Sequence, residues 1–400
     1  MEKESGEEVP GSVTKRKARV GIIATHPAPY RDATFSMLHS EGVYDLNVLF
    51  LFDREAERRH WNPGEPPYPH RYLGGYVRLH KHSVLHLHPL RALHQGRYDV
   101  LFIPCHNELT ALVAAAYATA RSIPLVYCAD SVRIHPLFDV RSRLRNGLVR
   151  FLLRESKAVW VPGLASREYM LHYGMPPSRI FQGSYTLDVD SLLEAMAGVE
   201  KNRAAIRRNL GIEDGATVFL MVANMIENRR HSLLLDAFER LNRERDVFLI
   251  LVGDGPERPG IEERCSRRKL RNVRIYRELP FDDLKFCYAA ADAYVHTGYE
   301  PYSTALDYGA IAALPLLTTT AVGAARNYTG LFREFPLTDP DDGGGLFENM
   351  KRAALSPALA RETGRKFRDR VRERNSRWAA DQLKQTIRTA LCGRAGIQDR

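Results

Sequence analysis

The sequence predicts an α/β protein of two domains, each built on a parallel sheet flanked by helices. Short apolar strands run into polar loops and then into helical segments, as in ARVGIIATHPAPYRD (18–32) and VFLILVGDGPER (247–258). This order is typical of parallel sheets, because parallel neighbours need a crossover that is usually a helix. With 400 residues and 44% hydrophobic content, the chain is long enough for two domains with separate cores.

The net positive charge of the chain favours anionic partners, but it does not indicate which class of anion binds. The chain has 58 Lys and Arg against 48 Asp and Glu, a formal net charge of +10. Nucleotide diphosphates, acidic lipid surfaces and nucleic acid would all suit this balance. The sequence has no zinc-finger spacing and no aromatic RNA-binding signature. We therefore expect no nucleic-acid partner.

Targeting and redox signals favour a cytoplasmic protein. Residues 1–17 are polar and charged, lack the apolar core of a signal peptide, and are expected to form a disordered lead-in. The longest apolar runs, at 109–120 and 310–317, are shorter than the roughly 20 residues of a membrane span. The five cysteines have no paired spacing, so neither a disulfide framework nor a zinc site is expected.

In the first domain, polar loops follow the predicted strands. Strands are expected at 19–25, 44–52, 98–108 and 123–131, with a helix at 109–121 and a long loop at 53–75. Loops after the carboxyl ends of parallel strands line the ligand crevice, which places His106 and Asp130 near a site. A helix N-cap is an equally open interpretation of Asp130.

Two further patterns in this half leave alternatives open. Histidines at 80, 82, 86, 88 and 94 include two His-x-His pairs that could hold a metal, although exposed or acceptor-facing side chains are the simpler interpretation. Residues 137–157 form a basic amphipathic helix, in which Arg141–Lys157 alternates basic and apolar positions. Such a helix packs on its domain or contacts an anionic membrane from the side.

The stretch YVHTGYEPYSTALDYGAIAALPLLTT, at 294–319, is the strongest functional signal. A buried strand runs into a glycine-containing turn, and Glu300-Pro301 is expected to open a helix. The free N–H groups at the start of a helix bind anions, most often phosphate. The helix start formed by Pro301, Tyr302, Ser303 and Thr304 is therefore expected to bind a phosphate, with backbone N–H donors on the three residues after the proline.

These residues resemble the donor-binding signature of family 4 retaining glycosyltransferases. In that family a Glu-Pro opens the helix and a second Glu, eight positions after the first, holds the nucleotide ribose. Glu300 matches the first Glu, whose implied role is toward the donor sugar, whereas Tyr308 stands at the second position and Asp307 is one residue early. Whether Tyr308 or Asp307 replaces the ribose-binding Glu stays open.

The resemblance extends over residues 19–391 and implies further site residues. Asn224 stands at the family's Arg position and Arg229 at its Lys position, both of which face the donor diphosphate. Other donor-side positions implied are Gly253 and, near the nucleotide base, Arg277, Glu278 and Leu279. The first loop implies an acceptor side at His26, Tyr30 and Arg31, and His106 and Asp130 complete the implied catalytic set with Glu300.

The family implies the GT-B fold, in which two Rossmann-like domains face each other. The expected divisions are a lead-in at 1–17, an acceptor-side domain at 18–190, a linker at 191–215, a nucleotide-sugar-binding domain at 216–370, and a helix at 371–400 that crosses back.

The implied activity is retaining, metal-independent transfer of a sugar from a nucleotide-diphosphate sugar to an acceptor hydroxyl of unknown identity. No cofactor beyond that co-substrate is expected. Asp188-Val189-Asp190 also spells an acid pair that metal-dependent sugar transferases use, and it is kept as an alternative. A degenerate GT-B protein that binds without turnover, and a pseudo-glycosyltransferase with a cyclitol-like donor, remain the other two hypotheses.

Overall fold

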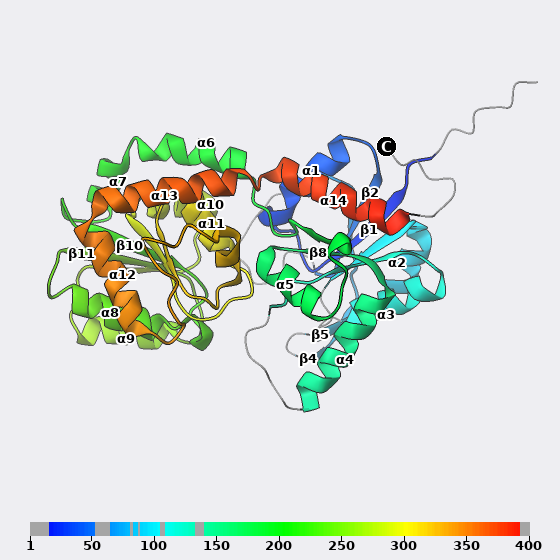
Figure 1. The fold of residues 1–400 in the computed structure, drawn as a ribbon, viewed down its shortest axis with the longest axis horizontal. Coiled ribbons are helices and arrows are strands. Elements are labelled where there is room, and N and C mark those ends of the chain that lie inside the picture. Colours follow the sequence, from blue (N-terminus) through cyan, green and yellow to red (C-terminus); the bar gives the residue numbers. More distant parts are fainter. Residues whose placement is uncertain are drawn as a thin grey trace, which may run out of the picture.

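The computed structural model describes residues 16–52, 65–80, 83–86, 89–104, 109–132 and 140–392. They form two lobes that lie side by side (Figure 1). Each lobe holds one parallel sheet, in the order β3-β2-β1-β6-β7-β8-β9 in the first and β12-β11-β10-β13-β14 in the second. The predicted fold class, α/β with parallel sheets flanked by helices, is confirmed.

The first lobe contains the elements from β1 to β9. Its strands are β1 Arg19–Ala24, β2 Asp45–Phe50, β3 His70–Tyr72, β6 Val100–Ile103, β7 Leu125–Cys128, β8 Ser156–Val161 and β9 Ile180–Gln182, with an antiparallel hairpin of β4 Tyr76–His80 and β5 Ser83–His86. Its helices are α1 Pro29–Ser40, α2 Pro89–Gly96, α3 Leu109–Ala120, α4 Val140–Glu155 and α5 Leu164–His172.

The second lobe repeats this alternation. Its strands are β10 Thr217–Val222, β11 Val247–Val252, β12 Val273–Tyr276, β13 Ala293–His296 and β14 Leu316–Thr318. Its helices are α6 Val189–Glu200, α7 Arg203–Asn209, α8 His231–Leu241, α9 Arg258–Arg267, α10 Phe281–Ala290, α11 Thr304–Ile311, α12 Gly343–Leu355 and α13 Pro357–Arg372. The chain ends in α14 Ser376–Leu391, and short 3₁₀ turns lie at Pro177–Arg179, Glu227–Arg229 and Gly323–Tyr328.

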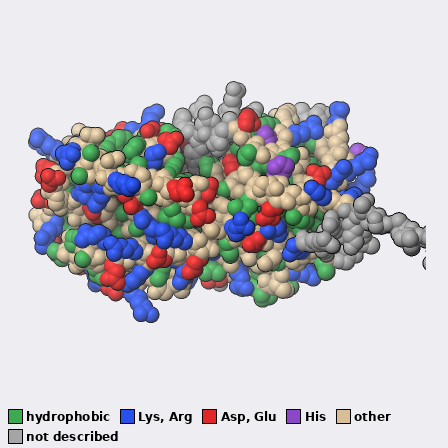
Figure 2. Space-filling model, turned by 90° about the horizontal axis from the view of Figure 1, so that it is seen from above, with side chains coloured by type: hydrophobic (Ala, Val, Ile, Leu, Met, Phe, Trp, Pro, Cys, Tyr) green, Lys and Arg blue, Asp and Glu red, His purple; other side chains and the backbone are tan. Residues whose placement is uncertain are grey.

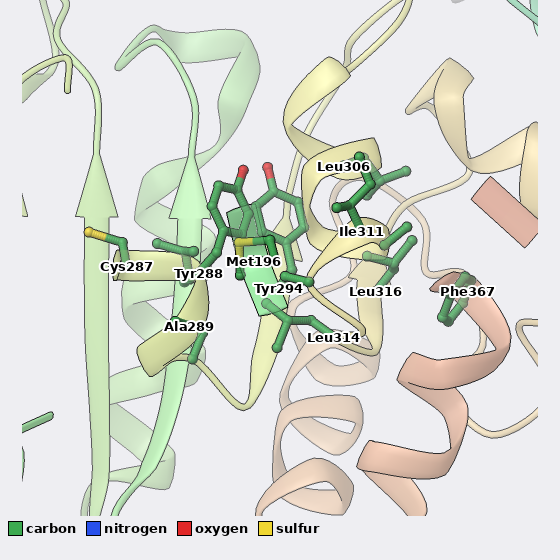
Figure 3. Packing of buried hydrophobic residues seen from close by; sticks show 14 of the residues in the cluster. Met196, Cys287, Tyr288, Ala289, Tyr294, Leu306, Ile311, Leu314, Leu316 and Phe367 are labelled. Carbon is green, nitrogen blue, oxygen red and sulfur yellow. The ribbon is translucent and has the colours of Figure 1, made fainter. Parts of the chain in front are cut away.

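Apolar side chains cover both faces of each sheet, which is why the strands are continuous apolar runs. In β1, Ile22 and Ile23 point into different cores on opposite faces. In the second lobe, the rings of Tyr288 and Tyr294 stack with centroids 5.9 Å apart, beside Leu306 and Ile311 of α11 (Figure 3). This core fixes α11 against the sheet.

Several boundaries differ from the sequence-based expectations. Residues 191–215, expected as a linker, lie largely in helices α6 and α7, and Met196, Ile206 and Ile212 among them are buried in the second core. The long loop at 53–75 contains strand β3, which pairs with β2. Helix α4 ends at Glu155, so that Lys157 already belongs to strand β8.

The end of the chain returns to the first lobe. Helix α13 lies over the second lobe, and α14 continues across the first (Figure 1). Leu383, Ile387 and Leu391 are buried there in the same core as the strand residue Val20. The break between the two helices, at 373–375, therefore sits where the two lobes meet.

The described surface carries mixed charge. In the view from above, basic side chains spread over both lobes and alternate with acidic ones (Figure 2). Among the described residues, no helix has both the length and the apolar character needed to cross a membrane.

Candidate active site

The turn between β13 and α11 is tied to two other segments. Gly298, at φ +74°, lets the chain turn so that the N–H of Tyr299 donates to the Asn228 carbonyl at 2.8 Å. The N–H of Glu300 then donates to the Ala321 carbonyl at 3.1 Å, and Glu300 forms a parallel bridge with Val322. These bonds fix the backbone of Glu300 before α11 begins.

The carboxylate of Glu300 is held between two cationic or titratable groups. Its Oε1 lies 2.6 Å from Nη2 of Arg229, and its Oε2 lies 2.7 Å from Nε2 of His296. The hydroxyl of Tyr294 lies 3.1 Å from the other ring nitrogen of His296. Burial opposes ionisation of Glu300, but His296 and Arg229 outweigh it and lower the pKa of this carboxyl below its usual value. Glu300 is therefore an oriented, ionised group.

Helix α11 begins later than the sequence predicts. Its first residue is Thr304, and Ser303 is the N-cap, whose hydroxyl accepts from the Leu306 N–H at 3.4 Å. Glu300-Pro301 therefore does not open the helix. The physical reason is that the bridge to Val322 keeps Glu300 extended. First-turn N–H groups have no intrahelical acceptor, so those of Thr304 and Ala305 are the helix donors suited to an anion.

Asp307 and Tyr308 point to different neighbours. Both oxygens of Asp307 accept phenol hydrogen bonds, from Tyr302 at 2.8 Å and from Tyr328 at 2.6 Å. Tyr308 stacks on Phe281 with ring centroids 5.2 Å apart, and burial raises the pKa of its phenol. With the helix starting at Thr304, Tyr308 is about one turn from the N-terminus, whereas a helix opened by Pro301 would have placed it about two turns away.

The buried carboxyl of Asp307 gives a pH prediction for stability. Burial raises its pKa to about 6, although hydrogen bonds from Tyr328 and Tyr302 and the charge of Arg374 oppose the shift. Because the folded pKa exceeds the unfolded one, this group contributes stability at low pH that is lost as pH rises through about 6.

We therefore expect the free energy of unfolding of the wild type, relative to Asp307→Asn, to rise by about 1 kcal/mol between pH 8 and pH 5. Urea titrations at both pH values measure this difference. A difference that does not change with pH would show that Asp307 has an ordinary pKa.

The other donor-side positions predicted from the sequence follow strands β10, β11 and β12, and one of them, Arg229, contacts this turn. Arg229 also donates to the Tyr299 carbonyl, so both of its terminal nitrogens serve the Glu300 loop. Asn224 is exposed, and Gly253 follows β11 with its N–H bonded to the Tyr276 carbonyl at 3.0 Å. Arg277 is exposed and lies 3.7 Å from Asp254, while Glu278 and Leu279 are half-buried beside it.

The predicted acceptor-side residues come together in the first lobe. Arg31 donates to the His26 carbonyl at 3.1 Å and lies over the ring of Tyr30. Tyr30 and Arg31 belong to the first turn of α1, which begins at Pro29. Asp130 does not cap a helix, because the two residues after it, Ser131 and Val132, are not helical; its carboxylate accepts from the Tyr185 hydroxyl at 3.0 Å. His106 lies outside the described residues.

Tyr185 joins the acceptor side to the donor loop. Its ring lies 4.7 Å from that of Tyr30 and 5.7 Å from that of Tyr302, measured between centroids. The residues predicted for the acceptor side and the loop that follows Glu300 therefore lie next to each other.

The described residues contain no group of three or more His, Cys, Asp and Glu side chains placed to hold a metal. Asp188 is the N-cap of α6 and accepts from Ser191, and Asp190 accepts from Asn375 at 3.3 Å. Of the histidine run, His86 is buried and bonds Thr110 and the Leu51 carbonyl, whereas His94 is exposed. His86 therefore differs from the expected exposed position. His82 and His88 lie outside the described residues.

Sequence reasoning missed two histidines of the site. His296 is fully buried against Glu300, and His231, the first residue of α8, is also buried. Burial, helped by nearby His296 and Arg229, lowers the pKa of His231 to about 4, which keeps it neutral. The sequence does contain a signal for one of them, because His296 is a polar residue at the end of the apolar strand that includes YVH.

Gly298 carries the sharpest prediction for stability. A Cβ at this position would lie 2.0 Å from the Asn228 carbonyl oxygen, and its φ of +74° disfavours any other residue. We expect Gly298→Ala to lower the free energy of unfolding by about 3 kcal/mol. Gly198→Ala is the matched control: nothing lies near its Cβ position inside α6, so it should stabilise by about 0.5 kcal/mol. Equal urea midpoints for Gly298→Ala and Gly198→Ala would show that the turn does not need a glycine at position 298.

Two lobes, each built on a parallel sheet flanked by helices, have the architecture of a GT-B protein. Two family models match the chain: "Glycosyl transferase 4-like domain" at residues 14–182 and "Glycosyl transferases group 1" at 202–331. The chain belongs to the family 4-like glycosyltransferases.

Individual relatives are distant. An uncharacterized glycosyltransferase of Methanocaldococcus jannaschii is 23% identical over 238 residues, which is 57% of this chain and 59% of that protein. The alpha-D-kanosaminyltransferase of Streptomyces kanamyceticus is 29% identical over 157 residues, 38% of this chain and 40% of that protein. The match thus spans less than two thirds of either relative.

A solved structure supports the fold. The structure of Anabaena HepE in complex with UDP and glucose superposes with a TM-score of 0.68 at 16% identity, covering 92% of this chain and 99% of that one. At this identity the similarity concerns the fold.

Proposed function

We propose that this chain is a retaining, metal-independent glycosyltransferase that moves a sugar from a nucleotide-diphosphate sugar to an acceptor hydroxyl. The observation that carries the proposal is the ionised, clamped Glu300 beside the capped N-terminus of α11. The contact between the rings of Tyr185 and Tyr302 supports a donor loop that lies next to the proposed acceptor-side residues of the first lobe. The family membership of both halves supports the same activity.

In the proposed step, the bond between the anomeric carbon and the diphosphate oxygen breaks, and a bond from the acceptor oxygen to that carbon forms on the same face. The acceptor proton passes to the leaving diphosphate. Negative charge develops on that diphosphate, and the amides of Thr304 and Ala305 together with the charge of Arg229 would stabilise it. Glu300 would accept hydrogen bonds from hydroxyls of the donor sugar.

Calorimetric titration with UDP-, GDP-, ADP- and TDP-linked sugars tests the proposal. A uridine-linked sugar is the first to try, because HepE shares the fold and is seen with UDP and glucose. The expected result is saturable binding of one member of the panel at one site per chain. Failure of every nucleotide sugar to bind would refute the proposal. Analysis of the product separates sugar transfer from coupling of a cyclitol-like group.

Turnover is expected to persist in EDTA, since helix amides and a guanidinium take the place of a divalent ion in this proposal. Rates measured before and after chelation should agree within about twofold, a barrier change of roughly 0.4 kcal/mol. If manganese or magnesium restored a rate lost on chelation, Asp188 and Asp190 would become the candidate metal ligands.

Peripheral membrane contact is proposed for α4. Phe151 is 48% exposed and is flanked along the helix by exposed Arg150 and Arg154, whereas Leu152 and Leu153 are buried. An exposed ring between basic side chains suits an anionic lipid surface. Cosedimentation with phosphatidylglycerol vesicles should exceed that with phosphatidylcholine vesicles and fall in Phe151→Ser. Equal sedimentation of the two proteins would refute the contact.

A further inference from the structure

Asp307 stands one residue before the position at which the family carries its ribose-binding Glu. In this chain its carboxylate binds two tyrosine hydroxyls. Asp307 is 6% exposed, and each of its carboxylate oxygens accepts a hydrogen bond from one phenol, that of Tyr302 or that of Tyr328. A buried carboxylate with two charge-assisted bonds fixes the groups that donate to it. One of them, Tyr302, lies in the loop between Glu300 and the Ser303 cap.

Tyr302 connects this carboxylate to the other lobe in two ways. Its ring packs edge-on against Tyr185, whose hydroxyl bonds Asp130 beyond β7. Its hydroxyl also accepts from Nδ2 of Asn327 at 3.2 Å, and Oδ1 of that same amide accepts from the Leu164 N–H at 3.0 Å. Leu164 is the first residue of α5 in the first lobe, so one asparagine joins both lobes.

The junction is closely packed on both sides. A Cβ on Gly163, just before Leu164, would lie 2.5 Å from Oδ1 of Asn327. Arg374 lines a small cavity together with Asp307, Tyr185 and Tyr302. Its guanidinium also donates to the Pro162 carbonyl, in the first lobe, at 3.0 Å. Arg374 lies in the break between α13 and α14, where the chain crosses from one lobe to the other.

We propose that Asp307 is a positioning residue that, through Tyr302 and Asn327, couples the donor loop at 300–303 to the first lobe. The proposal rests on the proposed function for its effect on transfer. With the coupling intact, Glu300 keeps its place relative to the acceptor-side residues. Asp307 does not touch the nucleotide.

Four variants test the coupling. Asp307→Asn keeps the shape but leaves one phenol without its carboxylate acceptor, and Tyr302→Phe removes the hydroxyl and keeps the ring. Gly163→Ala displaces Asn327 from the first-lobe side. Tyr98→Phe is the matched control, because it removes a buried phenol bonded to Asn47 at 2.9 Å, far from the junction.

In the ligand-free protein, hydrogen exchange of the Leu164 amide is the direct readout. Asp307→Asn and Tyr302→Phe should speed it at least about fivefold, whereas Tyr98→Phe should not, because local opening sets exchange. This arm needs no substrate. It therefore tests the coupling even if no nucleotide sugar binds. That result would refute the proposed function alone and would leave the test of the coupling valid.

In turnover, the three junction variants should lower kcat at least about tenfold, since small displacements of reacting groups are costly. The Kd of the nucleoside diphosphate should stay within about twofold, as expected for an interaction not made with the nucleotide. A tenfold weaker Kd with unchanged kcat would mean that Asp307 binds the nucleotide. Junction variants that match Tyr98→Phe in exchange and kcat would overturn the proposal.

Discussion

Glu300→Gln is expected to lower kcat about a hundredfold while the Kd of the nucleoside diphosphate changes by less than about threefold. Glutamine keeps the shape of the side chain and one acceptor for Arg229, but it lacks the charge that His296 and Arg229 hold in place. Its proposed partners are the hydroxyls of the donor sugar, so the loss should fall on the chemical step. Steady-state kinetics with the donor found by titration measure the effect.

Glu227→Gln provides the control, because Glu227 is an exposed acid in the turn that also carries Arg229. Its rate should equal that of the wild type. A Glu300→Gln enzyme that keeps more than about a tenth of the wild-type rate, roughly 1.4 kcal/mol of barrier, would remove Glu300 from the site.

Arg229→Ala is expected to reduce both stability and nucleotide binding. The guanidinium is 12% exposed and its partner Glu300 is 19% exposed, so the substitution leaves a largely buried carboxylate without its ion pair. Removing one member of such a pair costs about 3 kcal/mol. Loss of the same positive charge should weaken binding of the nucleoside diphosphate at least about tenfold, or 1.4 kcal/mol.

A double-mutant cycle separates the pair from the surroundings. Arg229→Ala combined with Glu300→Gln should be less destabilised than the sum of the single variants, by about 1–3 kcal/mol, because the uncompensated charge is gone. Urea unfolding of the four proteins provides the cycle. Strictly additive effects would mean that the ion pair contributes nothing to stability.

The architecture could be predicted from the sequence because its signals are local. The buried strands β10, β11 and β13 are apolar except for Thr217 at the start of β10 and His296 at the end of β13, and the glycines at 253 and 298 mark turns where the backbone must come close to a neighbour. Periodicity and turn residues depend only on neighbours in sequence, which is why they could be interpreted without a structure.

The site could be predicted only in part, because its details depend on contacts between distant segments. The start of α11 at Thr304 follows from the bridge between Glu300 and Val322, which no local pattern announces. Whether Asp307 faces the crevice depends on two phenols, one of them on Tyr328, 21 positions away in the chain. Side-chain orientation at a helix start is decided by such partners rather than by spacing.

The most direct test of the central claim is proton NMR of the protein with its nucleotide sugar in EDTA. If the chain is a metal-independent, retaining transferase, the donor's anomeric signal should disappear, and the first product should carry the donor's anomeric configuration. Glu300→Gln should slow this loss about a hundredfold. A nucleotide sugar that binds at saturation and stays intact, with candidate hydroxyl acceptors present, would contradict the claim and identify a GT-B protein that binds without turnover.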